Sequence, residues 1–272
     1  MIELPIGLVV TSLFGAVLAG FTCSIMGTFV VRMNLSSIGY CMSHAAFAGA
    51  AFGLMLSFDP VFGALLFSFI TAFSLGPVAE KAKLESNIVI GFLFSLMIAL
   101  AFIFLNYIPG QSASAKALRI LWGSILSISY NDVLLLALVS FVLVLFVVIF
   151  YKELMSVMFH RKMAEASGIN TKFFYFAVLF LTGITVSLSL RIVGGLLVFA
   201  LIINPTSTAY QFFFDFKKIL IFSPIIGVFS CIIGYYLSLV SDFPIGASIV
   251  ITSALFFAFS IIFSPKRIRR KI

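Results

Sequence analysis

Long apolar segments separated by short polar ones run through the whole chain. Most are close to the ~20 residues that an α-helix needs to cross the hydrocarbon core of a bilayer. The pattern therefore predicts an all-α, polytopic transmembrane helical bundle. The nine apolar runs cover residues 6–31, 39–58, 61–76, 88–108, 133–151, 173–190, 192–210, 219–240 and 245–263.

Two segments leave the number of crossings open. The seventh run contains Pro205, and proline is expected to break a helix because it lacks an N–H and its ring crowds the preceding turn. Residues 109–132 are too polar at their start to cross the membrane, and their apolar part is too short. Trp122, the only tryptophan, lies in this segment and suits a membrane interface. We therefore expect eight to nine membrane-crossing helices plus a short re-entrant or interfacial element.

Small side chains recur every four residues in the first two runs. On a helix, this spacing places them on one stripe, which lets helix backbones approach closely. The pattern predicts that both helices pack inside the bundle, although membrane sequences are also simply rich in Gly and Ala. This small-residue stripe comprises Ser12, Ala16, Gly20 and Ser24, then Cys41, Ala45, Gly49 and Gly53.

The charges lie between the apolar runs. Only 10% of residues are charged, the net charge is +8, and all but three of the 17 Lys and Arg residues fall in alternate connections or in the tail at 264–272. A cytoplasmic excess of Lys and Arg orients membrane proteins. We expect the N-terminus outside, the C-terminus in the cytoplasm, and a tail that faces anionic lipid and not nucleic acid. The three exceptions are Lys116, Arg119 and Arg191.

His44 is an ionisable residue inside the second apolar run. It precedes Ala45 of the small-residue stripe, so it is expected to face protein or a cavity, where such residues are commonly functional. Neutral imidazole is a good ligand for divalent transition metals, and Tyr40 and Cys41 lie within one turn on the same face. The alternative is a histidine that donates a hydrogen bond to a neighbouring hydroxyl or carbonyl; periodicity does not separate the two.

No constellation for catalysis competes with this reading. All nine carboxylates lie at or near the ends of apolar runs, whereas a proton or sodium relay normally needs one within a span. The chain has no GxxxxGK[ST] loop to cradle ATP phosphates. The sequence therefore predicts a transport subunit and not an enzyme, with any ATP hydrolysis supplied by a separate subunit.

The segment at 152–172 is the longest expected cytoplasmic connection. Within it, "RKMAEASG" predicts a short helix that ends with Gly168 at the C′ position. Such a helix is either an ordinary solvated segment or a docking element for a cytoplasmic partner.

Four segments together resemble one family. They are "GTFVVRMNLSSIGYCMSHAAFAGAAFG", "LRILWGSILSISYNDV", "KELMSVMFHRKMAEASGI" followed by "RIVGGLLVFALIINPTSTA", and "YLSLVSDFPIGASIVITSALFF". In this order and spacing, the chain resembles the integral-membrane permeases of ABC importers for zinc, manganese or iron(II), the ABC-3 family.

The resemblance implies a single permease domain over 1–272 in a bacterial or archaeal cytoplasmic membrane. It implies alternating access, a second permease copy, cytoplasmic ABC ATPase subunits and an external metal-binding receptor. The cargo would be a divalent metal of the zinc or manganese class, with no permanently bound cofactor. The ATPase coupling residues would be His160, Arg161, Lys162, Met163, Ala164, Glu165 and Gly168.

The resemblance also marks a departure at the expected metal site. The family motif reads Gly, Asp, Ala, Leu, Ser, His, Ala, and here the histidine carries over to His44 while Tyr40 stands at the aspartate position. A phenol with an ordinary pKa near ~10 supplies no fixed negative charge at neutral pH. Three interpretations remain: a zinc-leaning site of Cys41 and His44, a weak transient site with His44 from both protomers, or a cargo that is not a bare ion.

Two rival functions stay open at this point. One is an ABC permease for a larger cargo, such as a metal chelate or a vitamin, which a wide aromatic-lined cavity would favour. The other is an ATP-independent channel or carrier, which would lack an ATPase partner.

Overall fold

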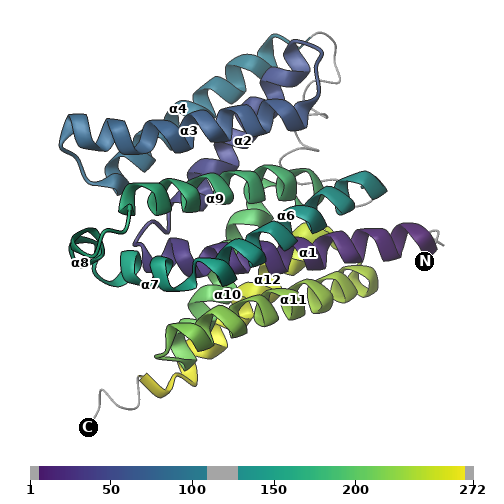
Figure 1. Ribbon diagram of the computed structural model, residues 1–272. Helices are drawn as coiled ribbons and strands as arrows, with labels where there is room; N and C mark the ends of the chain where they lie inside the picture. Colours follow the sequence, from purple (N-terminus) through teal and green to yellow (C-terminus); the bar gives the residue numbers. More distant parts are fainter. Residues whose placement is uncertain (1–5, 109–127, 267–272) are drawn as a thin grey trace.

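The computed structural model describes residues 6–108 and 128–266, which form eleven helices without a strand (Figure 1). Most of 109–132, where a re-entrant or interfacial element is expected, lies outside these residues, as does the tail from 267. The helices are α1 (Ile6–Arg32), α2 (Ile38–Met55), α3 (Pro60–Ala82), α4 (Ser86–Asn106), α6 (Tyr130–Ile149), α7 (Tyr151–Phe159), α8 (Arg161–Ala166), α9 (Thr171–Val193), α10 (Gly195–Phe212), α11 (Phe216–Ser241) and α12 (Ile245–Ile262).

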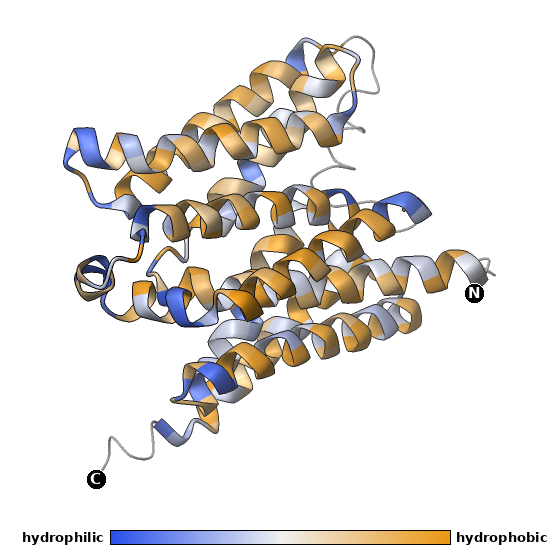
Figure 2. Ribbon diagram, in the orientation of Figure 1, coloured by the Kyte–Doolittle hydropathy of each residue, from blue (hydrophilic) through white to orange (hydrophobic). Residues whose placement is uncertain are grey.

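The predicted all-α membrane bundle is confirmed. Within the described ranges, eight helices are long and apolar enough to cross a membrane, namely α1, α2, α3, α4, α6, α9, α11 and α12. Hydrophobic residues fill most of the helix lengths, and the hydrophilic ones gather mainly near the two ends of the bundle (Figure 2). The protein is therefore a multi-pass membrane protein.

The expectation that Pro205 breaks a helix is wrong, because α10 continues through it to Phe212. Proline at 205 cannot donate to the carbonyl of Leu201 four residues earlier. The Ser24 hydroxyl of α1 donates to that oxygen instead, at 3.1 Å. In a membrane, a freed carbonyl is tolerated where a neighbouring helix satisfies it, and α1 does so here.

The small-residue stripe lies inside the bundle, as predicted. Ser12, Ala16 and Ser24 are buried in α1, and a methyl group at Gly49 of α2 would come within 2.0 Å of the Gly63 carbonyl oxygen in α3. These close approaches let α2 pack against α3 and α4 on one side, while α1 packs against α9, α10 and α11 on the other. Among the eight candidate membrane-crossing helices in the described ranges, α2 is the most deeply buried.

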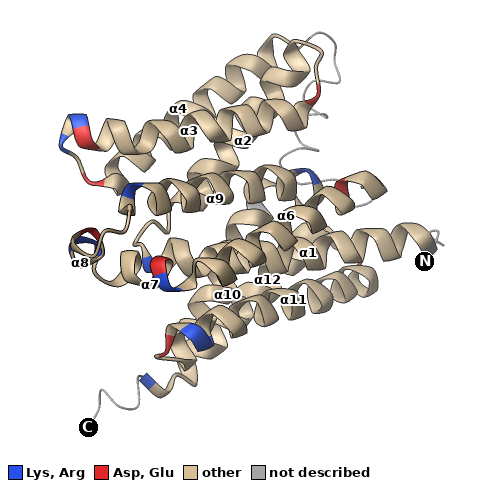
Figure 3. Ribbon diagram, viewed as in Figure 1, with Lys and Arg blue, Asp and Glu red and all other residues tan. Residues whose placement is uncertain are grey.

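Charged residues mark the two ends of the bundle differently (Figure 3). One end, here called the basic end, carries α7, α8, the turn between α3 and α4, and the start of α11. An ion pair of 3.7 Å between Lys172 and Glu80 joins α9 to α3 there. At the opposite end, Arg191 pairs with Asp132 at 3.0 Å. The chain thus separates its loops by charge, as their alternation along the sequence predicts.

Candidate functional site

His44 projects from the first half of α2, less than two turns after the helix begins at Ile38. Its Nδ1 lies 2.9 Å from the carbonyl oxygen of Tyr40, one turn earlier. A carbonyl only accepts, so Nδ1 carries the proton and the lone pair is on Nε2. Among the described residues, Nε2 forms no hydrogen bond. The imidazole is thereby fixed in the tautomer that histidine ligands commonly use, with one nitrogen donating to a carbonyl and the other available.

Aromatic rings surround this imidazole on one side. The Tyr40 ring centroid lies 4.9 Å from that of His44, and Phe94 of α4 lies 4.8 Å from His44. Tyr40 also contacts Phe94 at 5.0 Å and Phe199 of α10 at 4.6 Å, edge to face. Tyr40 is thus the central ring of a cluster built from three helices.

A cavity of about 380 Å³ adjoins this cluster. Tyr40, Phe94 and Phe199 form part of its wall, and Ser36 and Ser37 line it where α2 begins at the basic end. His44 is half-buried and does not line the cavity. The aromatic cluster therefore stands between the cavity and the imidazole.

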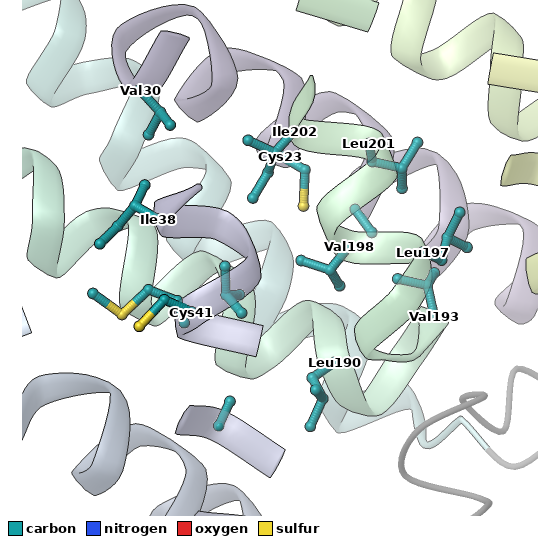
Figure 4. Close-up of a cluster of buried hydrophobic side chains, with 14 of the residues drawn as sticks. Cys23, Val30, Ile38, Cys41, Leu190, Val193, Leu197, Val198, Leu201 and Ile202 are labelled. Carbon is teal, nitrogen blue, oxygen red and sulfur yellow. The ribbon is translucent and has the colours of Figure 1, made fainter. Parts of the chain in front are cut away.

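Cys41 takes no part in the ring contacts. It is fully buried in the apolar core, in the cluster that also contains Ile38 and Val198 (Figure 4). Within the described part of the chain, no three His, Cys, Asp or Glu side chains are grouped so that they could hold a metal ion. Of the three predicted site residues, the structure brings Tyr40 and His44 into ring contact and leaves Cys41 among hydrophobic side chains.

The predicted helix in the segment 152–172 forms as α8, and its end is confirmed in detail. Gly168 adopts φ +82°, its N–H donates to the Glu165 carbonyl, and Ile169 N–H donates to the Ala164 carbonyl, both at 3.0 Å. This pair of bonds ends a helix at a left-handed glycine. Ala164 faces inward, whereas Met163 is 67% exposed at the surface.

Side chains tie α8 to the start of α9. Glu165 accepts hydrogen bonds from the Thr171 hydroxyl and from Arg161 Nε at 3.3 Å. The Thr171 bond, with help from Arg161, holds the pKa of the Glu165 carboxyl below its usual value. His160 and Lys162 are exposed beside these residues. The seven predicted coupling residues thus form one short surface structure anchored on α9.

A profile of the ABC 3 transport family matches residues 6–264, which is nearly the whole chain. The chain belongs to the ABC 3 transport family. It is accordingly a transport subunit and not an enzyme.

Relatives in this family align over almost their full lengths. The manganese transport system membrane protein MntC of Listeria monocytogenes is 32% identical over 94% of this chain and 90% of its own. The manganese import system permease protein ScaB of Streptococcus gordonii is 27% identical over 96% and 94%. The solved structure of PsaBC from Streptococcus pneumoniae in complex with Fab superposes with a TM-score of 0.84 at 26% identity, covering 94% of this chain and 91% of that chain.

Two residues of the site could not have been found in this ABC 3 chain from its sequence. Phe94 and Phe199 complete the aromatic cluster, but they are two of 34 phenylalanines, and nothing in their spacing singles them out. Only the packing of α4 and α10 against α2 reveals them. His44 could be predicted because an ionisable residue in an apolar run is conspicuous, and Tyr40 because it lies one turn before His44 at the aspartate position of the family motif.

Proposed function

We propose that the chain is the membrane-spanning permease of an ATP-driven importer that moves a divalent transition metal ion of the manganese or zinc class by alternating access. The observation that carries this proposal is the alignment with a manganese transport system membrane protein over 94% of the chain. Membership of an ABC transport family favours it over an ATP-independent channel. The manganese relatives favour it over a permease for a chelate or vitamin.

The proposed importer contains two copies of this permease, separate cytoplasmic ATPase subunits and an external receptor that delivers the ion. It lies in a bacterial or archaeal cytoplasmic membrane with the basic end and the C-terminus in the cytoplasm. The concentration of Lys and Arg at the basic end supports this orientation. The exposed α8, which presents Met163 at the surface, is the proposed contact for the ATPase.

His44 is the proposed ligand on the ion's route. Its free Nε2 can donate a lone pair to a divalent metal while the Tyr40 carbonyl holds the ring in place. Cys41 is buried in the apolar core, so a ligand set of Cys41 and His44 would require α2 to rearrange. A transient site completed by water, the Tyr40 phenol or the second copy's own histidine needs no such change.

ATP-driven uptake by reconstituted vesicles tests this function. We expect radioactive manganese or zinc to accumulate in vesicles that contain the permease and its ATPase only when ATP is present. His44→Ala should lower uptake at least roughly tenfold, since even residues that merely support metal ligands often cost that much. Ser43→Ala is the matched control, because it removes only a hydroxyl bonded to Gly39 O within the same helix. Uptake that is independent of ATP would contradict the function, and equal uptake by His44→Ala would exclude His44 from the route.

A further inference from the structure

A groove on the lipid-facing surface lies apart from His44 and does not include it. It has a volume of about 620 Å³, with α1 as its floor and α6 and α11 as its walls. Phe21 and Ile25 of α1 form the floor, and every lining residue is apolar. The lining consists of Phe21, Ile25, Val144, Val147, Val148, Leu220, Ile221, Pro224, Ile225, Val228 and Phe229.

The shape of this groove suits a single hydrocarbon chain. The α11 wall extends about 14 Å from Leu220 to Phe229, at ~1.5 Å per residue. Because α11 is long enough to cross the membrane, this wall runs along the direction that a lipid acyl chain takes in the bilayer. The walls remain exposed, with Val148 at 67% and Phe229 at 54%. In Figure 1, α11 lies on the opposite side of the bundle from α4, which carries the aromatic cluster's Phe94. The groove therefore lies away from the proposed ion route.

Lysines stand at the basic end of both walls. Lys217 precedes Ile221 by four residues and Lys218 precedes it by three, so both project near the face of α11 that lines the groove. Lys152 follows Val148 by four residues where α6 gives way to α7. All three lysines are exposed.

Two acidic residues also lie near these lysines. Asp215 caps α11 by accepting from Lys217 N–H at 3.0 Å, and Glu153 turns its Oε2 into the protein, where it has no hydrogen-bond partner among the described residues. Phe216, the first residue of α11, lies edge to face with Phe159 of α7, with ring centroids 6.4 Å apart, so α11 begins beside α7. The lysines of both walls thus lie at the same end of the groove.

We propose that this groove binds one anionic phospholipid, with an acyl chain between α6 and α11 and the headgroup phosphate at Lys152, Lys217 and Lys218. An apolar groove alone would accept any acyl chain, whereas lysines near the membrane surface favour an anionic headgroup by roughly fivefold each. The site is distinct from the transport function and does not depend on the identity of the cargo.

Native mass spectrometry of the purified full-length protein tests the proposal. The protein is mixed with equal amounts of phosphatidylglycerol and phosphatidylcholine that carry identical acyl chains. We expect one tightly held phosphatidylglycerol, preferred over phosphatidylcholine by at least about fivefold. The double variant Lys217→Gln/Lys218→Gln should lose most of this preference. Lys81→Gln/Lys83→Gln, which removes the same charge elsewhere at the basic end, should keep it.

A second pair of variants tests the groove itself. Ile225→Trp fills the α11 wall and should displace the bound lipid, whereas Leu237→Trp places the same bulk at an equally exposed position outside the groove; the two side chains are 42% and 43% exposed. The proposal would be overturned if the wild type retained both lipids equally. It would also be overturned if the two lysine double variants, or the two tryptophan variants, lost bound phosphatidylglycerol to the same extent. So would oxidative cross-linking of Phe229→Cys between two copies, because a second chain would then cover the groove; the three native cysteines are buried.

Discussion

At the scale of single residues, Tyr40 decides the chemistry around His44. Its backbone carbonyl fixes the imidazole tautomer, and its ring contacts His44, Phe94 and Phe199. A carboxylate in this place would add a negative charge and an oxygen ligand, which manganese prefers. The phenol adds no fixed charge. In this arrangement its ring also separates His44 from the cavity.

Tyr40→Asp is therefore expected to favour manganese. The new carboxylate would lie one turn from His44 and offset the charge of a divalent cation, so uptake at low manganese concentration should rise relative to zinc. Competition between the two radioactive ions in reconstituted vesicles measures this ratio. Tyr40→Asn is the matched control, since it opens the same space without the charge. Identical ratios in the two variants would show that space, and not charge, limits the wild type.

The sequence could predict part of this site. It identified His44 as the ionisable residue in a span, and it left two roles open: a metal ligand or a hydrogen-bond donor to a carbonyl. The donor role is confirmed through Nδ1, and the ligand role of Nε2 stays a prediction. Cys41 is buried because it belongs to the small-residue stripe. Its spacing of three residues from His44 is compatible with both packing and metal binding, so the sequence alone could not decide between these two roles.

At the scale of helices, the sequence correctly predicted those helix ends that depend only on neighbouring residues. Gly168 ends α8 as predicted because its φ of +82° depends on the glycine itself. The rule for Pro205 failed because a distant partner overrides it: Ser24 of α1 supplies the hydrogen bond that α10 lacks. Pairings between helices cannot be read from one chain's periodicity, so helix breaks inside a membrane bundle are poorly predicted.

Gly49→Ala should destabilise the contact between α2 and α3. Its Cβ would meet the Gly63 carbonyl oxygen at 2.0 Å, and that backbone cannot move aside without shifting α3. Overpacking of this kind costs about 1–3 kcal/mol, which should lower the thermal midpoint of the protein in detergent. Gly91→Ala is the matched control, because nothing lies within 4 Å of a Cβ at that position of α4. Equal midpoints for both variants would show that α3 yields to the added methyl.

At the scale of the whole molecule, one continuous path joins the proposed ATPase contact to the aromatic cluster. Glu165 ties α8 to Thr171 at the start of α9. From there α9 runs the length of the bundle to Val193, Gly194 turns the chain with φ +86°, and α10 returns with Phe199 against the Tyr40 ring. A displacement of α8 would therefore reach the cluster through two rigid helices and one glycine turn.

Glu165→Gln is expected to loosen the first link of this path. The amide keeps an oxygen for Thr171 but loses the charge that attracts Arg161, so amide hydrogen exchange across residues 161–170 should be faster than in the wild type, and less metal should be imported per ATP hydrolysed. Lys81→Gln, an exposed charge change at the basic end but outside α8, should alter neither. Unchanged exchange in Glu165→Gln would contradict the anchoring role of the carboxylate.

The contact between Glu165 and Thr171, which joins α8 to α9, should weaken at low pH. Because the bonds from Thr171 and Arg161 lower the pKa of Glu165 in the folded protein, its stabilising charge is fully present above the usual carboxyl pKa of about 4.3 and is lost as the pH falls through the lowered value. The exchange difference between wild type and Glu165→Gln should therefore persist from neutral pH to about pH 4 and vanish below the lowered pKa. Comparing the two proteins at each pH cancels the intrinsic acid dependence of exchange. A difference that is already gone at pH 5 would mean that some group other than the Glu165 carboxylate holds α8 on α9.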